Sequence, residues 1–193
     1  KALVDHFQRY KESGRPTIVD GGDGEASVQL RKAIQRADEA IRGKAREEPA
    51  LSGMGTTIVA VVVSSLSPLQ LMIGHVGDSR AYLYRGHELR LLTRDHSLVE
   101  DLLARGHISP EEVPSHPQRH ILVRALGIEG QTDPDIASQA IQPGDILLLC
   151  TDGLWGEIHG NAMAQALKGS NIVHTVPMLL SQAEAKGGQH VDN

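Results

Sequence analysis

The sequence contains almost no cysteine and no long apolar run. Cys150 is the single cysteine among 193 residues, which excludes an intramolecular disulfide and a zinc site built on a CxxC motif. A chain without disulfides suits a reducing compartment, so we expect a cytoplasmic protein. The longest apolar run covers residues 58–63, far fewer than the roughly 18 that a membrane-spanning helix needs. We therefore expect no insertion into a membrane.

The chain also lacks any excess of basic side chains. It has 19 Lys and Arg against 24 Asp and Glu, which gives a net charge of −5. Nucleic-acid-binding domains carry a basic surface and a high isoelectric point, so nucleic acid is not an expected partner. The length fits one domain, at roughly 100–200 residues per domain. We accordingly predict a single domain over residues 1–193.

Hydrophobic periodicity predicts paired helices that alternate with runs of strands. The predicted helices cover residues 3–10, 30–41, 97–105, 161–167 and 172–185, and a further helix starts at Ser109. The predicted strands cover residues 56–63, 69–76, 81–84, 88–92 and 146–150, and the first and last of these are expected to be buried. This order favours a layered α+β domain over a doubly wound parallel sheet.

Three aspartates lie at the ends of predicted strands or near glycines, in segments that could bind a metal ion. Asp78 and Asp152 each follow a predicted strand, and Asp192 follows two glycines near the end of the chain. Carboxylates at strand ends can converge on one point, and Mg²⁺ and Mn²⁺ prefer oxygen ligands. Structural alternatives exist for all three. Asp152 could simply form an Asp-Gly turn. Asp78 could form a salt bridge with Arg80 or act as a cap, and Asp192 could belong to a flexible tail.

Several short motifs occur in a fixed order along the chain. They are GMGTT at 53–57, GDSRAY at 77–82, LTRDHS at 92–97, HPQRH at 116–120 with RALG at 124–127, and PGD at 143–145 followed by LLCTDGLW at 148–155. In this order they resemble the metal-dependent protein Ser/Thr phosphatases of the PPM (PP2C) family, in the style of its bacterial members. The resemblance extends over essentially the whole chain.

The resemblance implies a sandwich of two antiparallel β-sheets with a pair of helices on each face. Asp152 and Asp192 match the family's ligands for a pair of Mn²⁺ or Mg²⁺ ions, and Asp78 matches an aspartate that helps to hold a third ion. The implied reaction is hydrolysis of phosphoserine and phosphothreonine in proteins by a metal-activated water. The implied partners are phosphorylated proteins and a cognate Ser/Thr kinase, whose action the phosphatase would oppose.

The chain departs from the family pattern at both ends. The family's first metal motif, an Asp-Gly-Met-Gly-Gly-type turn, and the phosphate-binding Arg before it do not precede the predicted helix at 3–10, so no catalytic residue is assigned here. The spacing from Gly188 to Asp192 is two residues longer than the family's. We expect a fragment that lacks the first strands and the last strand. The alternative is a pseudophosphatase that binds a phosphoprotein or a kinase without turnover.

Other candidate residues receive structural interpretations. Residues 20–23 superficially resemble the missing motif, but they lie between two predicted helices and we expect a loop there. We favour a surface loop for His116 and His120, because Pro117 argues against one continuous helix. His96 is expected to end a strand before Ser97 caps the next helix, and Cys150 to be buried and inert. The ten histidines show no spacing typical of a zinc site.

Overall fold

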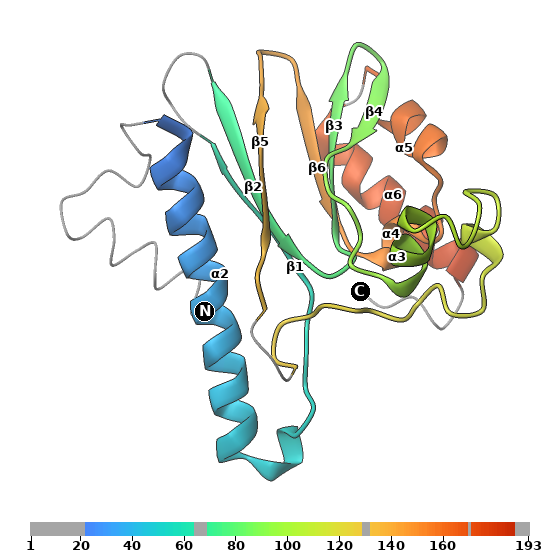
Figure 1. The fold of residues 1–193 in the computed structure, drawn as a ribbon. Coiled ribbons are helices and arrows are strands. Elements are labelled where there is room, and N and C mark those ends of the chain that lie inside the picture. The colour runs from blue at the N-terminus through green and yellow to red at the C-terminus, as the bar shows by residue number, and fades with distance from the viewer. Residues whose placement is uncertain (1–21, 64–68, 129–131, 170, 188–193) are drawn as a thin grey trace. The chain divides into compact units, whose positions relative to one another are not determined.

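The computed structural model describes residues 22–63, 69–128, 132–169 and 171–187 (Figure 1). These residues form helices and two antiparallel sheets of three strands each, so the predicted α+β class is confirmed. The chain divides into two compact units. The first unit comprises residues 1–78 and 95–141, and the second comprises residues 79–94 and 142–193. The predicted helix at 3–10 lies outside the described residues.

The first unit contains one sheet in the order β1-β2-β5, with all neighbours antiparallel. Its elements are α2 (Gly22–Glu47), the 3-10 turn η1 (Pro49–Leu51), β1 (Ile58–Val63), β2 (Gln70–Val76), α3 (Leu98–Ala104), the 3-10 turn η2 (Val113–Ser115) and β5 (Asp135–Ala140). The register sets His75 of β2 opposite Asp135 of β5, and this pairing brings two polar side chains to one end of the sheet.

Helix α2 forms the core of the first unit by packing against β2. Leu30 and Ile34 are fully buried and cluster with Met72, Val76 and Leu126. The helix approaches β2 so closely that a Cβ atom at Gly74 would lie 2.7 Å from the Ile34 side chain. Glycine at that position therefore lets the helix lie directly on the strand, as Figure 1 shows for α2 and the β1-β2-β5 sheet.

The second unit contains a sheet in the order β4-β3-β6, again antiparallel throughout. Its elements are β3 (Arg80–Arg85), β4 (Glu88–Leu91), β6 (Ile146–Cys150), α4 (Asp152–Trp155), α5 (Gly160–Leu167) and α6 (Ile172–Gly187). The core joins Tyr82 of the sheet to apolar side chains of the helical segments, namely Leu154, Ile158, Met163, Leu179 and Ala183. The predicted hairpin is confirmed, since Gly86 and His87 both have the positive φ of a two-residue turn.

Several expectations about local structure are wrong. The strand predicted to be buried at 146–150 is half-buried or exposed in β6, and His96 does not end a strand, because β4 ends at Leu91. The strand predicted at 56–63 begins at Ile58, and its residues are half-buried or exposed because β1 lies at an end of its sheet. Helix α2 begins at Gly22, so the loop predicted at 20–23 is helix at residues 22 and 23, while residues 20 and 21 lie outside the described part of the chain. No helix starts at Ser109. Only the short η2 forms, since Pro114 removes a backbone donor. Cys150 is half-buried rather than buried.

Within the described ranges, no helix combines the length and the apolar character that crossing a bilayer requires.

Candidate functional site

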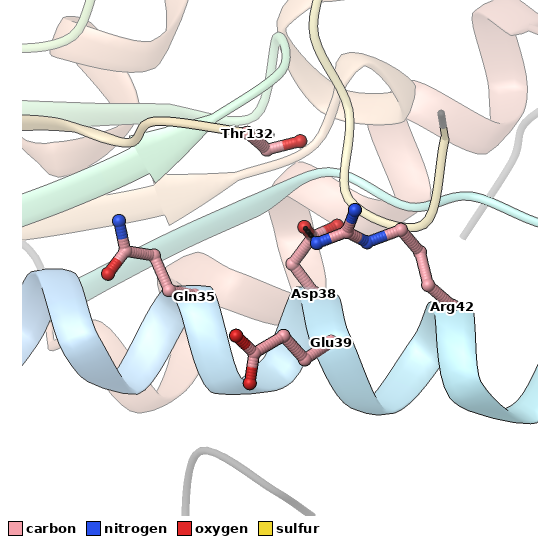
Figure 2. A pocket seen from close by; sticks show the side chains of 5 residues that line it. All are labelled: Gln35, Asp38, Glu39, Arg42 and Thr132. Atoms are coloured by element: carbon pink, nitrogen blue, oxygen red, sulfur yellow. Dashed lines mark ion pairs between the residues drawn. The ribbon is translucent and has the colours of Figure 1, made fainter. Parts of the chain in front are cut away.

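A polar pocket of about 260 Å³ lies beside α2 in the first unit, lined by Gln35, Asp38, Glu39, Arg42 and Thr132 (Figure 2). Its buried carboxylate already has structural partners. Asp38 pairs with Arg42 at 2.8 Å and accepts a hydrogen bond from the Gly127 amide at 2.7 Å. Asp38 therefore anchors the RALG segment to the helix, and we do not assign this pocket to substrate.

Motifs that are separate in the sequence meet in the first unit. Thr56 and Leu126 exchange two backbone hydrogen bonds of 3.0 and 2.8 Å, which join the GMGTT and RALG segments. The next residue, Thr57, packs against Gly77 so closely that a Cβ atom at Gly77 would lie 2.3 Å from its Cγ2. Gly77 also has φ +99°, which side chains rarely allow. The ordered motifs thus enclose the turn that carries Asp78.

The Gly77–Asp78 turn follows β2 and is held by His96. The Gly77 amide donates to Nδ1 of His96 at 3.1 Å, and the backbone amide of His96 donates to the Gly77 carbonyl at 3.0 Å. His96 is 3% exposed, so water does not compete for these contacts. Asp78 itself is half-buried. Both peptide groups of Gly77 are therefore fixed just before the candidate ligand.

The hydrogen bond from Gly77 determines where His96 carries its proton. Because Nδ1 accepts, the neutral ring must be protonated at Nε2. Nε2 lies 3.3 Å from Oδ2 of Asp135, although the two groups are not aligned as a good hydrogen bond. Burial lowers the pKa of His96 to about 4, with smaller contributions from the charges of Arg124 and His75. The ring is thus neutral at physiological pH.

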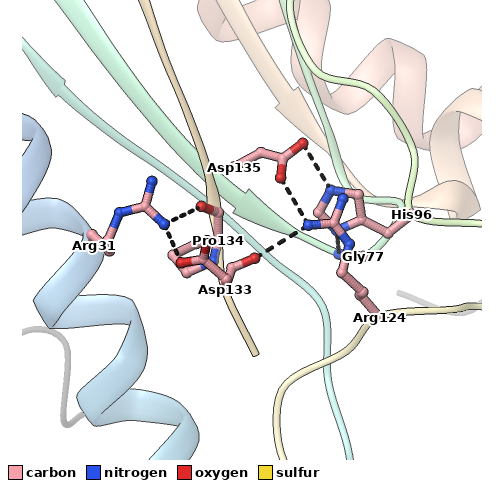
Figure 3. A network of polar contacts seen from close by, with 7 residues as sticks. All are labelled: Arg31, Gly77, His96, Arg124, Asp133, Pro134 and Asp135. Atoms are coloured by element: carbon pink, nitrogen blue, oxygen red, sulfur yellow. Dashed lines mark hydrogen bonds and ion pairs between the residues drawn. The ribbon is translucent and has the colours of Figure 1, made fainter. Parts of the chain in front are cut away.

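A chain of ion pairs continues outward from His96 (Figure 3). Arg124 binds Oδ1 of Asp135 at 2.8 Å and the carbonyl of Asp133 at 3.2 Å. Arg31 of α2 binds the Asp133 carboxylate and the backbone carbonyl of Pro134. Burial raises the pKa of Asp135, but Arg124 and His96 together hold it below its usual value. Asp135 therefore stays charged beside the neutral imidazole.

His75, His96 and Asp135 could be read as a metal site, since one ligand atom from each lies within 4.8 Å of the others. The two rings are stacked with centroids 4.6 Å apart. No spacing in the sequence indicated this cluster, because it depends on the β2–β5 register and on a loop. Two features of the geometry disfavour a metal there. Nδ1 of His96 accepts the Gly77 amide, which requires the ring proton on Nε2, and the Arg124 guanidinium binds one oxygen of the Asp135 carboxylate.

Asp152 begins α4 in the second unit and is exposed. Its position is fixed locally. The Gly156 amide donates to the Asp152 carbonyl at 2.8 Å, and a Cβ atom at Gly156 would lie 2.7 Å from that oxygen. Leu154 of the same helix enters the core. The carboxylate is thus held on a short, anchored turn that directly follows β6.

Arg80 and Trp155 connect the start of β3 to the same turn. The guanidinium carbon of Arg80 lies 3.5 Å from the centroid of a Trp155 ring, and its Nη1 donates to the Tyr82 hydroxyl at 3.1 Å. Trp155, which belongs to the same short helix as Asp152, thus makes a cation–π contact with Arg80.

The predicted metal ligands fall in different parts of the structure. Asp78 belongs to the first unit and Asp152 to the second, while Asp192 lies outside the described residues. Strand-end carboxylates on fixed turns are donors that suit Mn²⁺ or Mg²⁺. The assignment of these three aspartates to metal stays a prediction. His120 is exposed and His116 is half-buried, and residues 116–120 form turns rather than a helix, as expected.

Comparisons with known proteins give one consistent result. The family model for protein phosphatase 2C matches residues 7–102. The chain is 41% identical over 166 residues to the serine/threonine phosphatase stp of Listeria monocytogenes, and this match covers 86% of the chain and 65% of that protein. The chain thus spans 65% of the length of the Listeria relatives that it matches.

Solved structures agree with the sequence matches. The crystal structure of the Mycobacterium tuberculosis serine/threonine phosphatase PstP/Ppp aligns with a TM-score of 0.82 at 32% identity, covering 97% of this chain and 75% of that one. A structure of the PstP catalytic domain in complex with two manganese ions aligns with a TM-score of 0.77 at 28% identity, covering 97% and 74%.

Proposed function

Because the chain belongs to the protein phosphatase 2C family, we propose that its protein hydrolyses phosphoserine and phosphothreonine in other proteins with the aid of Mn²⁺ or Mg²⁺. Its substrates would be proteins phosphorylated by a Ser/Thr kinase, so the reaction would oppose that kinase. The relatives named above are serine/threonine phosphatases, and one related structure holds manganese.

The observation that carries the proposal is the way the two carboxylates are presented. Asp78 directly follows a glycine whose two peptide groups are hydrogen-bonded to His96. Asp152 starts a helical turn that is anchored in the core by Leu154. Fixed carboxylates of this kind match the needs of hard cations, which take oxygen ligands and keep several waters.

In the proposed site Asp152 and Asp192 hold the tightly bound ions, and Asp78 helps to hold a further one. Bound divalent cations would neutralise phosphate oxygens and lower the pKa of an attacking water. The chain's own contribution is to orient its carboxylates, and the contacts of Gly77 and Gly156 keep the two turns from shifting.

The main test measures phosphate release from a phosphothreonine peptide by the complete protein, with and without Mn²⁺. Asp152→Asn should lower turnover by more than about 100-fold, which exceeds the usual effect of residues that only orient a ligand. It should also weaken Mn²⁺ binding in calorimetric titration. Glu157→Gln is the matched control, since it neutralises a nearby carboxylate of the same segment and should leave both measurements unchanged. Full activity of Asp152→Asn would refute the metal assignment.

A second variant separates the roles of the two aspartates. Asp78→Ala should slow turnover while the tightly bound ions are retained in calorimetric titration. Loss of all tight Mn²⁺ binding in this variant would show that Asp78 belongs to the tight pair instead.

The same assay distinguishes the phosphatase from a non-catalytic binding protein. We expect hydrolysis by the complete protein, and comparison with the 193-residue chain shows whether these residues alone suffice. If the complete protein is folded, binds Mn²⁺ and the phosphopeptide, and still releases no phosphate, it is a pseudophosphatase.

A further inference from the structure

We propose that His96 is a positioning residue, which fixes the Gly77–Asp78 turn by accepting the Gly77 amide proton at Nδ1 and so sets the direction of the Asp78 carboxylate. The contacts stand by themselves, but their effect on the reaction rests on the proposed function of Asp78. The sequence suggested only that His96 ends a strand before a helix cap, so this role goes beyond that interpretation.

His96 forms hydrogen bonds with both the amide and the carbonyl group of Gly77. One hydrogen bond runs from the Gly77 amide to the His96 ring at 3.1 Å, and another runs from the His96 amide to the Gly77 carbonyl at 3.0 Å. The His96 carbonyl in turn accepts from the Val123 amide at 2.9 Å. Without the imidazole, the buried Gly77 amide would lose its acceptor, which is costly away from water. The turn would then move to find another partner.

The surrounding charges favour the His96 tautomer that the hydrogen bond from Gly77 requires. Nδ1 can accept only when the proton is on Nε2, and Nε2 faces the charged Asp135 carboxylate at 3.3 Å. Arg124 holds the other oxygen of that carboxylate at 2.8 Å. The partner of one imidazole nitrogen sets the role of the other. Nε2 and Asp135 are not aligned as a hydrogen bond, but the nearby negative charge favours a proton on Nε2 by electrostatic attraction, and Arg124 keeps that carboxylate in place.

The same side chains could instead bind a metal ion, but that role requires the other tautomer of His96. A metal bound by His75, His96 and Asp135 would need the lone pair of Nε2, and the proton would have to move to Nδ1. Nδ1–H would then face the Gly77 amide, which is also a donor. Two donors would oppose each other at 3.1 Å. The observed geometry is thus that of a positioning group and not of a ligand.

The first test requires no metal and no activity. In ¹⁵N-labelled complete protein, long-range ¹H–¹⁵N spectra of the imidazoles should show Nδ1 of His96 as the unprotonated acceptor and Nε2 as the protonated nitrogen. The Gly77 amide should exchange slowly with solvent. In His96→Leu this amide should exchange faster, whereas in His96→Asn the side-chain oxygen can replace Nδ1 and should restore protection. Finding the proton on Nδ1 of the wild type would overturn the proposal.

The second test follows the Mn²⁺ concentration needed for half-maximal phosphate release. His96→Leu should raise it by about 10-fold, the usual effect of removing a group that orients a ligand, with a smaller change at saturating Mn²⁺. His96→Asn should recover most of this loss. Ile34→Val is the control, because it perturbs a fully buried side chain of the same unit that has no hydrogen bond to the turn. It should lower stability without changing the Mn²⁺ requirement.

The outcomes separate this proposal from the proposed function. A wild type that releases no phosphate at any Mn²⁺ concentration would contradict the function, and the tautomer and exchange measurements would still decide the role of His96. Equal exchange rates and equal Mn²⁺ requirements in wild type and His96→Leu would show that His96 does not position the turn. Retention of one Zn²⁺ by the wild type and its loss in Asp135→Asn would make the cluster a metal site and would also overturn the proposal.

Discussion

The two turns that carry Asp78 and Asp152 are held in place by different kinds of contact. The Gly77–Asp78 turn in the first unit is held by His96, 19 residues further along the chain, and by Thr57 from the segment before β1. The Asp152 turn in the second unit is held mainly by its own sequence, through the hydrogen bond from Gly156 four residues later. One turn depends on distant contacts and the other on local helical geometry.

This difference determines how much stability a substitution in each turn should cost. A turn held by buried long-range polar contacts loses several interactions together, because such networks are strongly coupled. A turn that belongs to a short helix loses single contacts of ordinary size. We therefore expect substitutions at the Gly77–Asp78 turn to cost more stability than those at the Asp152 turn.

The largest expected effect is that of Gly77→Ala. The added Cβ would lie 2.3 Å from Cγ2 of Thr57 and would occupy a residue with φ +99°. Strain and overpacking should together lower the free energy of unfolding by about 3 kcal/mol. Urea unfolding monitored by circular dichroism measures this change.

A matched glycine separates the two causes. Gly53 has φ +78°, but a Cβ there would meet no atom within 4 Å. Gly53→Ala should therefore cost about 1 kcal/mol, from backbone strain alone. Equal losses for the two variants would mean that the contact with Thr57 is unimportant, and the contrast between the two turns would then rest on His96 alone.

The next effect is a loss of stability in mild acid. The pKa of His96 is lowered from its usual 6.5 to about 4 in the folded protein. Between these two pH values the unfolded state therefore binds a proton at His96 that the folded state does not bind. Stability should be unaffected above about pH 6.5 and should fall as the pH drops toward 4, by about 3 kcal/mol at most. Urea unfolding at several pH values across this window measures the loss.

His96→Asn provides the control for this pH dependence. The variant has no imidazole at the site, so the part of the slope between pH 6.5 and 4 that comes from His96 should disappear. Losses from carboxylates with lowered pKa, such as Asp135 and Asp145, should remain at lower pH. An unchanged slope in the variant would show that another group causes the acid sensitivity.

Local features were predictable from the sequence, and long-range ones were not. The β3–β4 hairpin and the Ser97 cap, whose hydroxyl accepts from the Glu100 amide at 3.3 Å, depend on neighbouring residues and were predicted correctly. The positions of Asp78 and Asp152 after strands also followed from the hydrophobic pattern. The network around His96 did not, because it depends on the β2–β5 register.

The helix predicted from Ser109 onward is absent because of a residue that follows the cap signal. The sequence after Ser109 has a good helix start, and the Ser109 amide does donate to the Glu112 carboxylate at 2.7 Å. Pro114 nevertheless prevents helix growth within one turn. A cap signal is thus not sufficient for a helix here, because the residues that follow it decide whether the helix can grow.

The smallest expected effect tests the locally held turn. Arg80→Lys keeps the positive charge but replaces the flat guanidinium that lies 3.5 Å from the Trp155 ring centroid. Because a lysine stacks less well on an aromatic ring, unfolding should become easier by about 1 kcal/mol. Arg119→Lys, at an exposed arginine in the turn at 117–120, is the control and should change stability by less than about 0.5 kcal/mol. A loss as large as that of Gly77→Ala would contradict the comparison, because it would mean that the Asp152 turn also depends on a coupled network centred on Arg80.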